Sequence, residues 1–203
     1  MQLAIADGRA ARSRWRLQLN TGTLGSRAMT RETQRQAEDV VIRALLPSDV
    51  ELFRSLRMRA LEDSPDAYVE TIDGARDCDW QARTARLFLS DPPDGVAYVA
   101  CVGDLPIGMV LAGQKDHNDS PFLAAMWVHP DFRRRGVGNS LVARALAFLR
   151  SAGQQHVSLW VTETHAGVFK FYESLGFQRT GARSPLRAGS DTTILEMARP
   201  LVD

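Results

Sequence analysis

The sequence predicts a single α/β domain in which helices cover both faces of a sheet. The chain has 203 residues, of which 44% are hydrophobic and 24% charged, which suits a globular domain with a well-buried core. After residue 40, short β-branched runs alternate with runs of helical periodicity. Residues 122–128 are apolar without alternation, which is typical of a central strand buried on both faces.

Charge and cysteine content exclude several classes of protein. The 25 basic and 24 acidic side chains give a formal net charge of +1, so the composition demands neither nucleic acid nor an anionic membrane as partner. Cys78 and Cys101 cannot build a multi-bridge framework and have no metal-site spacing. No apolar run approaches the ~20 residues that cross a bilayer. A reducing cytoplasm is therefore the expected location.

The first part of the chain differs from the rest. Residues 1–37 are rich in arginine, poor in acidic residues and without sustained apolar periodicity. Such a segment cannot bury enough surface to offset its ordering entropy. We expect a flexible basic extension over residues 1–37 and a folded domain over residues 38–203. A transit peptide with a similar composition, and an alternative start at Met29, stay open.

The first half of the domain is expected to contain two helices and three strands. Ser48 and Glu51 match a capping box, which predicts a helix start. Two apolar runs around Gly103 and Asp104 predict an antiparallel hairpin. In chain order we expect a strand at 40–45, a helix from the capping box to 63, a helix at 80–89, and hairpin strands at 96–102 and 107–113.

The second half is expected to contain two more helices and further strands. Val137, Leu141 and Ala145 belong to one broad apolar stripe on a helix that ends near Gly153. The remaining elements are the central strand at 122–128, a strand at 156–162, a helix at 165–175, a strand after Gly176 and a last strand at 192–197.

A glycine-rich turn follows the central strand and opens the next helix. In this turn Arg133, Gly136 and Gly138 form the pattern Arg-x-x-Gly-x-Gly. Glycines at a helix start leave the backbone N–H groups unobstructed, and these groups together with the positive helix end favour a phosphate or pyrophosphate. Arg134 and Arg135 add guanidinium donors. The turn is neither a P-loop nor a dinucleotide fingerprint, so we predict a phosphate cradle of another kind.

Two motifs occur in the second half of the domain, the first before one of its two predicted helices and the second on the other. The first is Val-His-Pro at residues 128–130 with the glycine turn after it, and the second is Phe-Tyr-Glu-Ser-Leu-Gly-Phe at residues 171–177. Together they resemble the signatures of the GCN5-related N-acetyltransferases, the GNAT family, which transfer an acetyl group from acetyl-CoA to an amine. The resemblance covers residues 40–201. It implies a mixed, mostly antiparallel sheet of six to seven strands with helices on both faces.

The resemblance also implies which residues hold the cosubstrate acetyl-CoA. The strand end at Trp127 and Val128 would offer backbone groups to the pantetheine arm, and amides of residues 133–138 would hold the pyrophosphate. His165 stands where the family often has an Asn that touches the arm. No metal is expected. The full set of implied coenzyme-binding residues is Trp127, Val128, Arg133, Arg134, Arg135, Gly136, Val137, Gly138, Asn139, Ser140, His165, Phe169 and Tyr172.

Acetyl transfer needs a base for the amine and an acid for the leaving thiolate. An alkylammonium of pKa ~10.4 must lose its proton, and a thiolate of pKa ~8.5 gains from protonation. Tyr172 is the expected general acid, with a core aromatic as the alternative, and an amide near Val128 is the expected donor to the acetyl carbonyl. Many relatives carry a glutamate on the central strand, where residues 123–126 are apolar here. The base is therefore unknown, with the candidates Glu163, His117, Asp116 and a water chain.

The acceptor pocket is implied to lie between residues 57–70 and 114–121. These segments carry acidic side chains that suit a cationic amine, and equally suit a solvated loop. The sequence does not distinguish a small-molecule amine from a peptide or protein amine. The acidic residues concerned are Asp63, Asp66, Glu70, Asp116 and Asp119.

Two functions from different classes stay open. The first is an acetyl-CoA-dependent N-acetyltransferase that acts by direct attack of a primary amine on the thioester. The second is a non-catalytic acyl-CoA-binding module with a sensor or regulatory role, because no strand carboxylate supplies the base. Expected partners are acetyl-CoA and an amine, without nucleic acid or membrane, and a homodimer is left open.

Overall fold

The computed structural model describes residues 40–88, 94–114 and 120–201, so the predicted extension at 1–37 lies outside the described residues. Seven strands form one sheet in the order β1-β2-β3-β4-β5-β7-β6. Neighbours pair antiparallel except β4 and β5, which are parallel, so the predicted mixed, mostly antiparallel sheet is confirmed. The strands are β1 (Val40–Ala44), β2 (Gly95–Val102), β3 (Leu105–Gly113), β4 (Phe122–Val128), β5 (His156–Thr162), β6 (Gln178–Pro185) and β7 (Thr193–Pro200).

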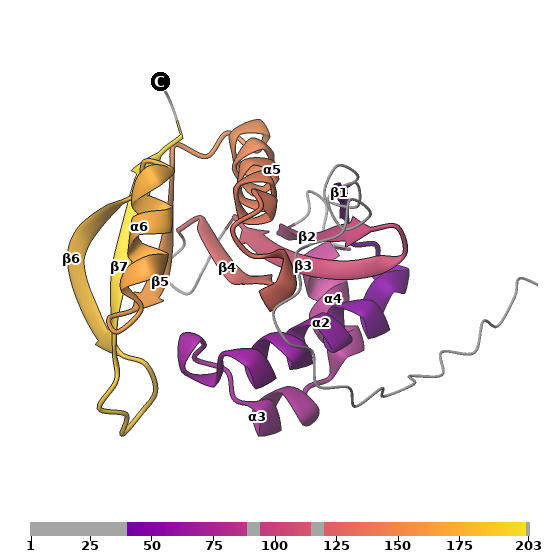
Figure 1. Cartoon of the computed structure of the whole chain (residues 1–203). Coiled ribbons are helices and arrows are strands. Elements are labelled where there is room, and N and C mark those ends of the chain that lie inside the picture. Colours follow the sequence, from indigo (N-terminus) through magenta and orange to yellow (C-terminus); the bar gives the residue numbers. More distant parts are fainter. Residues whose placement is uncertain (1–39, 89–93, 115–119, 202–203) are drawn as a thin grey trace, which may run out of the picture.

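Helices cover both faces of this sheet (Figure 1). Helices α5 and α6 lie on one face, and α2, α3 and α4 lie on the other, as predicted for a central sheet. Helix α3 has five residues and was not predicted, because so short a helix carries no periodicity. The helices are α2 (Val50–Asp63), α3 (Ile72–Arg76), α4 (Trp80–Phe88), α5 (Val137–Ser151) and α6 (Ala166–Ser174), with the short 3-10 turns η1 (Pro47–Asp49), η2 (Pro65–Ala67) and η3 (Pro130–Phe132).

Each face of the sheet has its own hydrophobic core. Leu141 and Leu149 of α5 pack with Phe169 of α6 against one face. Phe53 of α2 and Trp80 of α4 pack against the other face, with their rings 5.5 Å apart. Burial of such large side chains contributes about 1.5–3 kcal/mol each, which fixes the helices on the sheet. In the described part of the chain, no helix is both long enough and apolar enough to cross a membrane.

The predicted capping box at the start of α2 is wrong. Asp49 occupies the N-cap position, and the helix start has no side-chain cap. The Asp49 carboxylate instead accepts a hydrogen bond from the Leu46 amide at 2.9 Å, because the short turn η1 precedes the helix. A capping box formed by Ser48 and Glu51 would need Ser48 at the N-cap, which is one residue before the N-cap that the structure shows.

Strand β4 contains a β-bulge at its centre. Trp127 pairs with Met109 and Ala124 pairs with Leu111, so two residues of β4 stand opposite one residue of β3. In the bulge Ala125 has φ 52°, a left-handed conformation that costs a non-glycine residue about 1–2 kcal/mol. Such strain is typical of functional sites, since a bulge redirects backbone groups away from their usual partners.

Beyond its first residue, β4 leaves β5. The one parallel register pair between them joins Phe122 to Ser158, supported by a hydrogen bond from the Ser158 amide to the Pro121 carbonyl at 3.0 Å. The two strands then diverge and open the sheet toward their carboxyl ends. The apolar run of β4 therefore lines an opening and is not buried on both faces as predicted; Ala124, for example, is exposed.

Candidate active site

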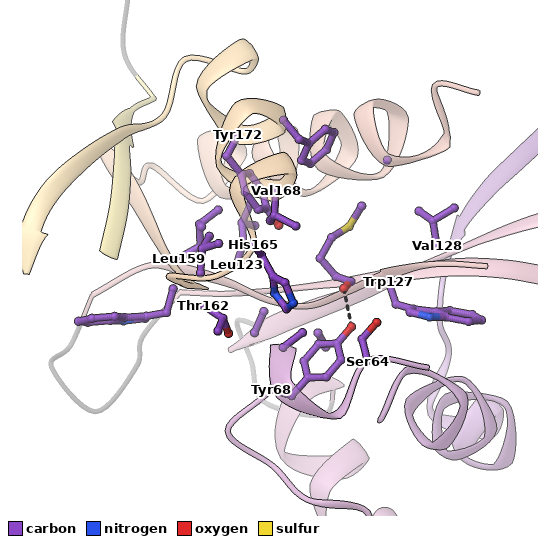
Figure 2. A pocket seen from close by; sticks show the side chains of 18 of the residues that line it. Ser64, Tyr68, Leu123, Trp127, Val128, Leu159, Thr162, His165, Val168 and Tyr172 are labelled. Carbon is purple, nitrogen blue, oxygen red and sulfur yellow. Dashed lines mark hydrogen bonds between the residues drawn. The ribbon is translucent and has the colours of Figure 1, made fainter. Parts of the chain in front are cut away.

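A cavity of about 1310 Å³ occupies the opening between β4 and β5. This volume exceeds the 300–1,000 Å³ of most small-ligand pockets, so it suits a long ligand together with a second molecule. Figure 2 shows side chains of β4, β5 and α6 on one side and the segment after α2 on the other. The wall of the cavity includes the half-exposed apolar side chains of Trp160 and Val168.

The start of α5 forms one end of the cavity. Gly136 is the N-cap residue with φ 82°, and a side chain built there would meet no atom within 4 Å. The first intrahelical hydrogen bond runs from the Ser140 amide to the Gly136 carbonyl at 3.1 Å. The amides of the three residues before Ser140 therefore have no acceptor in the helix and can bind an anion. This geometry fits a pyrophosphate.

The second glycine of the turn has a packing role. A Cβ at Gly138 would lie 3.2 Å from the side chains of both Met126 and Phe171. Gly138 therefore allows α5 to approach β4 and α6 closely. The close packing places the start of α5, the predicted phosphate cradle, beside the opening between β4 and β5.

Arg133 ties the cradle to its surroundings. Its amide donates to the Pro130 carbonyl at 3.2 Å, and its Nε donates to the Val128 carbonyl at 2.9 Å. Its Nη2 bonds the Asp63 carboxylate, which also accepts from Trp127 Nε1 at 3.1 Å. With these groups engaged, Arg133 holds α2, β4 and the turn together beside the cavity.

The other residues of the predicted cradle fall into two groups. Arg134, with φ 61°, and Asn139 line the cavity. Arg135 lies over the Phe132 ring at 5.4 Å, and Val137 is buried in the core. Ser140 is exposed and is not part of the cavity wall. The side chains of this second group therefore do not face the site.

The edge of β4 presents backbone groups to the opening. The His129 amide bonds the Ile107 carbonyl of β3 at 2.8 Å, so alternate residues of the strand face away from β3. In agreement, the Val128 carbonyl accepts from Arg133, and the Met126 carbonyl accepts from Tyr68 Oη at 2.8 Å. Because N–H and C=O of one residue point to the same side in a strand, we expect the Val128 amide to face the opening.

Tyr172 lies on α6 where the cavity meets the core. Its side chain is buried and packs edge-on against Phe171 and Phe177, with ring centroids 4.9 and 5.5 Å away. Burial raises the pKa of Tyr172 above its usual value, and nearby Tyr68 raises it further. No hydrogen-bond partner of the Tyr172 hydroxyl is found in the described part of the chain. The hydroxyl thus keeps its proton in the cavity wall.

The remaining α6 residues divide between cavity and core. His165 occupies the N-cap position of α6 without a side-chain cap hydrogen bond, lines the cavity and lies between Tyr68 and Tyr172 in Figure 2. Phe169, predicted to touch the coenzyme, is 2% exposed and lies in the core beneath Arg179. It is not part of the cavity wall.

The predicted base candidates do not enter the cavity. Glu163 is half-exposed, bonds Arg183 Nη2 at 2.5 Å and is absent from the cavity wall. Asp116 and His117 lie outside the described residues. Among the described residues, no group of three or more His, Cys, Asp and Glu side chains is arranged to hold a metal ion.

Three cavity residues were not singled out from the sequence. Tyr68 follows η2, and its ring packs against the Arg57 guanidinium at 4.2 Å. Arg83 of α4 bonds Glu70 at 2.6 Å. Arg57 carried a usable signal, because it follows Phe53 by four residues on the buried face of α2. An arginine inside an apolar stripe indicates a buried charge with a partner.

Comparison with known proteins identifies the family. A sequence model described as the acetyltransferase (GNAT) family matches residues 53–177, which is more than half of the chain. The chain therefore belongs to the GNAT family of acetyltransferases. The yncA protein of Salmonella typhimurium, determined with its cofactor acetyl-CoA, shares the fold with a TM-score of 0.66. That match has 19% identity and covers 81% of this chain and 95% of the other.

Two curated relatives illustrate the range within the family. The mycothiol acetyltransferase of Acidothermus cellulolyticus is 29% identical over 158 residues, which are 71% of this chain and 46% of that protein. The N-acetylaspartate synthetase of Rattus norvegicus is 32% identical over 91 residues, which are 45% of this chain and 30% of that protein. The matches to the first curated relatives span 30–62% of their lengths.

Proposed function

We propose that this chain is an N-acetyltransferase that moves an acetyl group from acetyl-CoA to an amine by direct attack on the thioester. The observation that carries the proposal is one continuous cavity. It joins the free amides at the start of α5, the open edge of β4 and the Tyr172 hydroxyl. The family supports the same activity, since its matched relatives are acetyltransferases.

The cradle would fix the coenzyme by its phosphates. The amides of Val137, Gly138 and Asn139 would bind the pyrophosphate, aided by the helix dipole and the Arg134 guanidinium. The pantetheine arm would then follow the diverging edges of β4 and β5 along the apolar wall. The Val128 amide would donate a hydrogen bond to the acetyl oxygen as negative charge develops there.

Tyr172 would supply the proton to the leaving sulfur. In the reaction the amine nitrogen bonds to the acetyl carbon, the carbon–sulfur bond breaks, and the thiolate takes the phenolic proton. Burial raises the pKa of Tyr172, so the phenol carries its proton near neutral pH, and the same dry surroundings raise the proton affinity of the thiolate. Holding amine and thioester together supplies most of the acceleration.

We assign removal of the amine proton to His165. Burial by itself raises the pKa of Glu70, but hydrogen bonds from Arg57 and Arg83 outweigh it and hold the pKa below its usual value. Glu70 is thus a poor base. Histidine is the side chain best suited to accept a proton near neutral pH. His165 lines the cavity opposite Tyr68.

The experiment combines coenzyme binding with thiol release. Titration calorimetry should detect acetyl-CoA binding, and a thiol reagent should detect CoA release that depends on an added small-molecule or peptide amine. CoA release at the same rate with and without an amine would contradict the proposal. So would the absence of CoA release with every amine of a broad panel when acetyl-CoA binds. The second outcome would favour the acyl-CoA-binding module.

Location and assembly belong to the same proposal. We place the protein in the cytoplasm, which the free thiols of Cys78 and Cys101 support. A homodimer stays a prediction, which sedimentation of the purified chain would test.

A further inference from the structure

The acceptor side of the cavity contains a cluster of three charged side chains from three parts of the chain. Arg57 of α2 donates from Nε to Glu70 Oε2 at 2.7 Å, and Arg83 of α4 donates from Nη1 to Glu70 Oε1 at 2.6 Å. All three residues line the cavity. We call them the Arg57–Glu70–Arg83 cluster.

The cluster has one more positive charge than negative. Its single carboxylate serves two guanidinium groups, and the Arg57 side chain is 6% exposed. Within the described residues, Arg57 Nη1 is buried and has no hydrogen-bond partner. The face of the Tyr68 ring offsets part of this charge. A buried cationic donor without an acceptor is costly, so the cluster is built to receive an anion.

A ligand can reach this cluster through Arg83. The Arg83 side chain is 32% exposed, whereas Arg57 lies deeper. Arginine presents a planar set of donors that matches carboxylate and phosphate oxygens. An anionic group that enters the cavity would therefore meet Arg83 first and lie in the field of Arg57 behind it.

Of the five acidic residues expected in the acceptor pocket, Glu70 lines the described wall, Asp63 and Asp66 do not, and Asp116 and Asp119 lie outside the described residues. Asp63 is engaged by Trp127 and Arg133, and Asp66 does not line the cavity. Glu70 is the one carboxylate among the described lining residues, and its charge is already shared. The described part of the wall therefore favours an acceptor with an anionic group over a polycationic one.

We propose that the acceptor amine also carries an anionic oxygen group, a carboxylate or a phosphate, which binds at the Arg57–Glu70–Arg83 cluster. The inference rests on the acetyltransferase function proposed above. Tyr68 lies between the two parts of the site, because its ring packs on Arg57 and its hydroxyl reaches the Met126 carbonyl on β4. The anionic end of the acceptor would lie beyond Tyr68, with the amine toward His165 and Tyr172.

Binding to the complex with CoA tests the subsite without acetyl transfer. The probes are amino acids with increasing separation of amine and carboxylate, the carboxamide of each, and aminoalkyl phosphates of matched length. We expect at least one acid or phosphate to bind about tenfold more tightly than its neutral counterpart. Which of the two anions binds best identifies the group. Equal binding of charged and neutral partners throughout the series would overturn the proposal.

Variants test whether the Arg57–Glu70–Arg83 cluster causes the tighter binding of anionic amines. Arg83→Gln should bring the ratio of charged to neutral binding close to one, while Arg76→Gln, an exposed arginine of α3 outside the cavity wall, should leave it unchanged. Arg57→Gln should act in the same direction, and a melting curve reports whether this buried variant folds. An unchanged ratio in folded Arg83→Gln would overturn the assignment.

Separate assays distinguish failure of the subsite from failure of the function. Preferred binding of the anionic amines without acetyl transfer would retain the subsite and contradict catalysis. Equal acetylation of the acids and their carboxamides would retain catalysis and contradict the subsite.

Discussion

Tyr172 combines burial with a place in the cavity wall, and this combination favours its proposed role as proton donor over that of a core aromatic. A buried tyrosine hydroxyl without a ligand role would bond a neighbouring carbonyl, as even the hydroxyl of the half-buried cavity residue Tyr68 does with Met126. The Tyr172 hydroxyl has no such partner in the part of the chain that the structure describes. Its hydrogen-bonding capacity is thus left for a ligand.

Replacement of Tyr172 by Phe should lower turnover and spare binding. The variant keeps the ring contacts with Phe171 and Phe177, so we expect the Kd of acetyl-CoA to change less than about threefold and kcat to fall about 10²-fold. Tyr98→Phe, on β2 outside the cavity, is the matched control. Rates of Tyr172→Phe equal to wild type would assign Tyr172 to the core.

Replacement of His165 by Gln should have an effect that depends on pH. Near neutral pH we expect kcat to fall about 10²-fold, because no group then removes the amine proton. At alkaline pH much of the loss should disappear, since solvent deprotonates an amine of pKa ~10.4. His156→Gln, at the exposed start of β5, is the control. A loss of equal size at every pH would argue against His165 as the base.

At the scale of elements, the turn before α5 and the segment after α2 define the two ends of the cavity. Gly136→Val should weaken acetyl-CoA binding by tenfold or more, because a side chain would enter the open space in front of the helix amides. Gly153→Val has the same positive φ and the same open surroundings at the far end of α5. Equal binding by the two variants would mean that the cradle does not hold the coenzyme.

The segment after α2 is held in place by Arg187. Its guanidinium donates to the carbonyls of Pro65 and Tyr68 at 2.7 Å each and to that of Val69 at 3.0 Å. Hydrogen bonds from charged groups contribute about 1.5–3 kcal/mol each when buried, and less at a half-buried site such as this one.

Loss of Arg187 should therefore loosen the acceptor wall. We expect Arg187→Ala to raise the KM of the amine several-fold and to leave the Kd of acetyl-CoA unchanged. Arg183→Ala removes an exposed arginine that bonds Glu163 outside the cavity and serves as the control. Steady-state kinetics with each substrate varied in turn checks the prediction, and a parallel change in coenzyme affinity would contradict it.

At the scale of the whole molecule, ion pairs beside the cavity couple stability to pH. Burial raises the pKa of Asp63, but hydrogen bonds from Ser64, Trp127 and Arg133 outweigh it, and the pKa is lowered as it is for Glu70. A lowered pKa in the folded state adds stability above the usual carboxyl pKa of about 4, and this stability is lost as pH falls through the folded value.

Removal of one of these carboxylates should make the Tm depend less steeply on pH in the acid range. The Tm of the wild type should fall steeply below about pH 4. In Glu70→Gln the Tm should be lower at pH 7, and the difference from the wild type should shrink as pH falls. Thermal melting of both proteins between pH 7 and the acid range measures this difference in Tm. A difference that grows toward low pH would contradict the sign of the Glu70 pKa shift.

Apart from the short helix α3, sequence reasoning reached the order of elements and the glycine-opened start of α5, because both depend on local patterns. The apolar runs, the hairpin turn and the glycines before α5 each act within a few residues. The acceptor side depends on contacts between distant parts of the chain. Asp63 with Arg133 and Arg57 with Glu70 are pairs that no spacing rule predicts. For this reason Asp63 and Glu70, two of the acidic residues expected to face an amine, are instead partners of arginine.

If the cavity brings acetyl-CoA and an amine together for transfer, each CoA released must correspond to one acetylated amine. The most direct measurement is mass spectrometry of the amine during CoA release, with Gly136→Val alongside the wild type. We predict one acetylated amine for each CoA released by the wild type, and about tenfold less of both products from the variant when acetyl-CoA is below the wild-type Kd. Release of CoA without acetylated amine, or equal product from both proteins, would contradict the account.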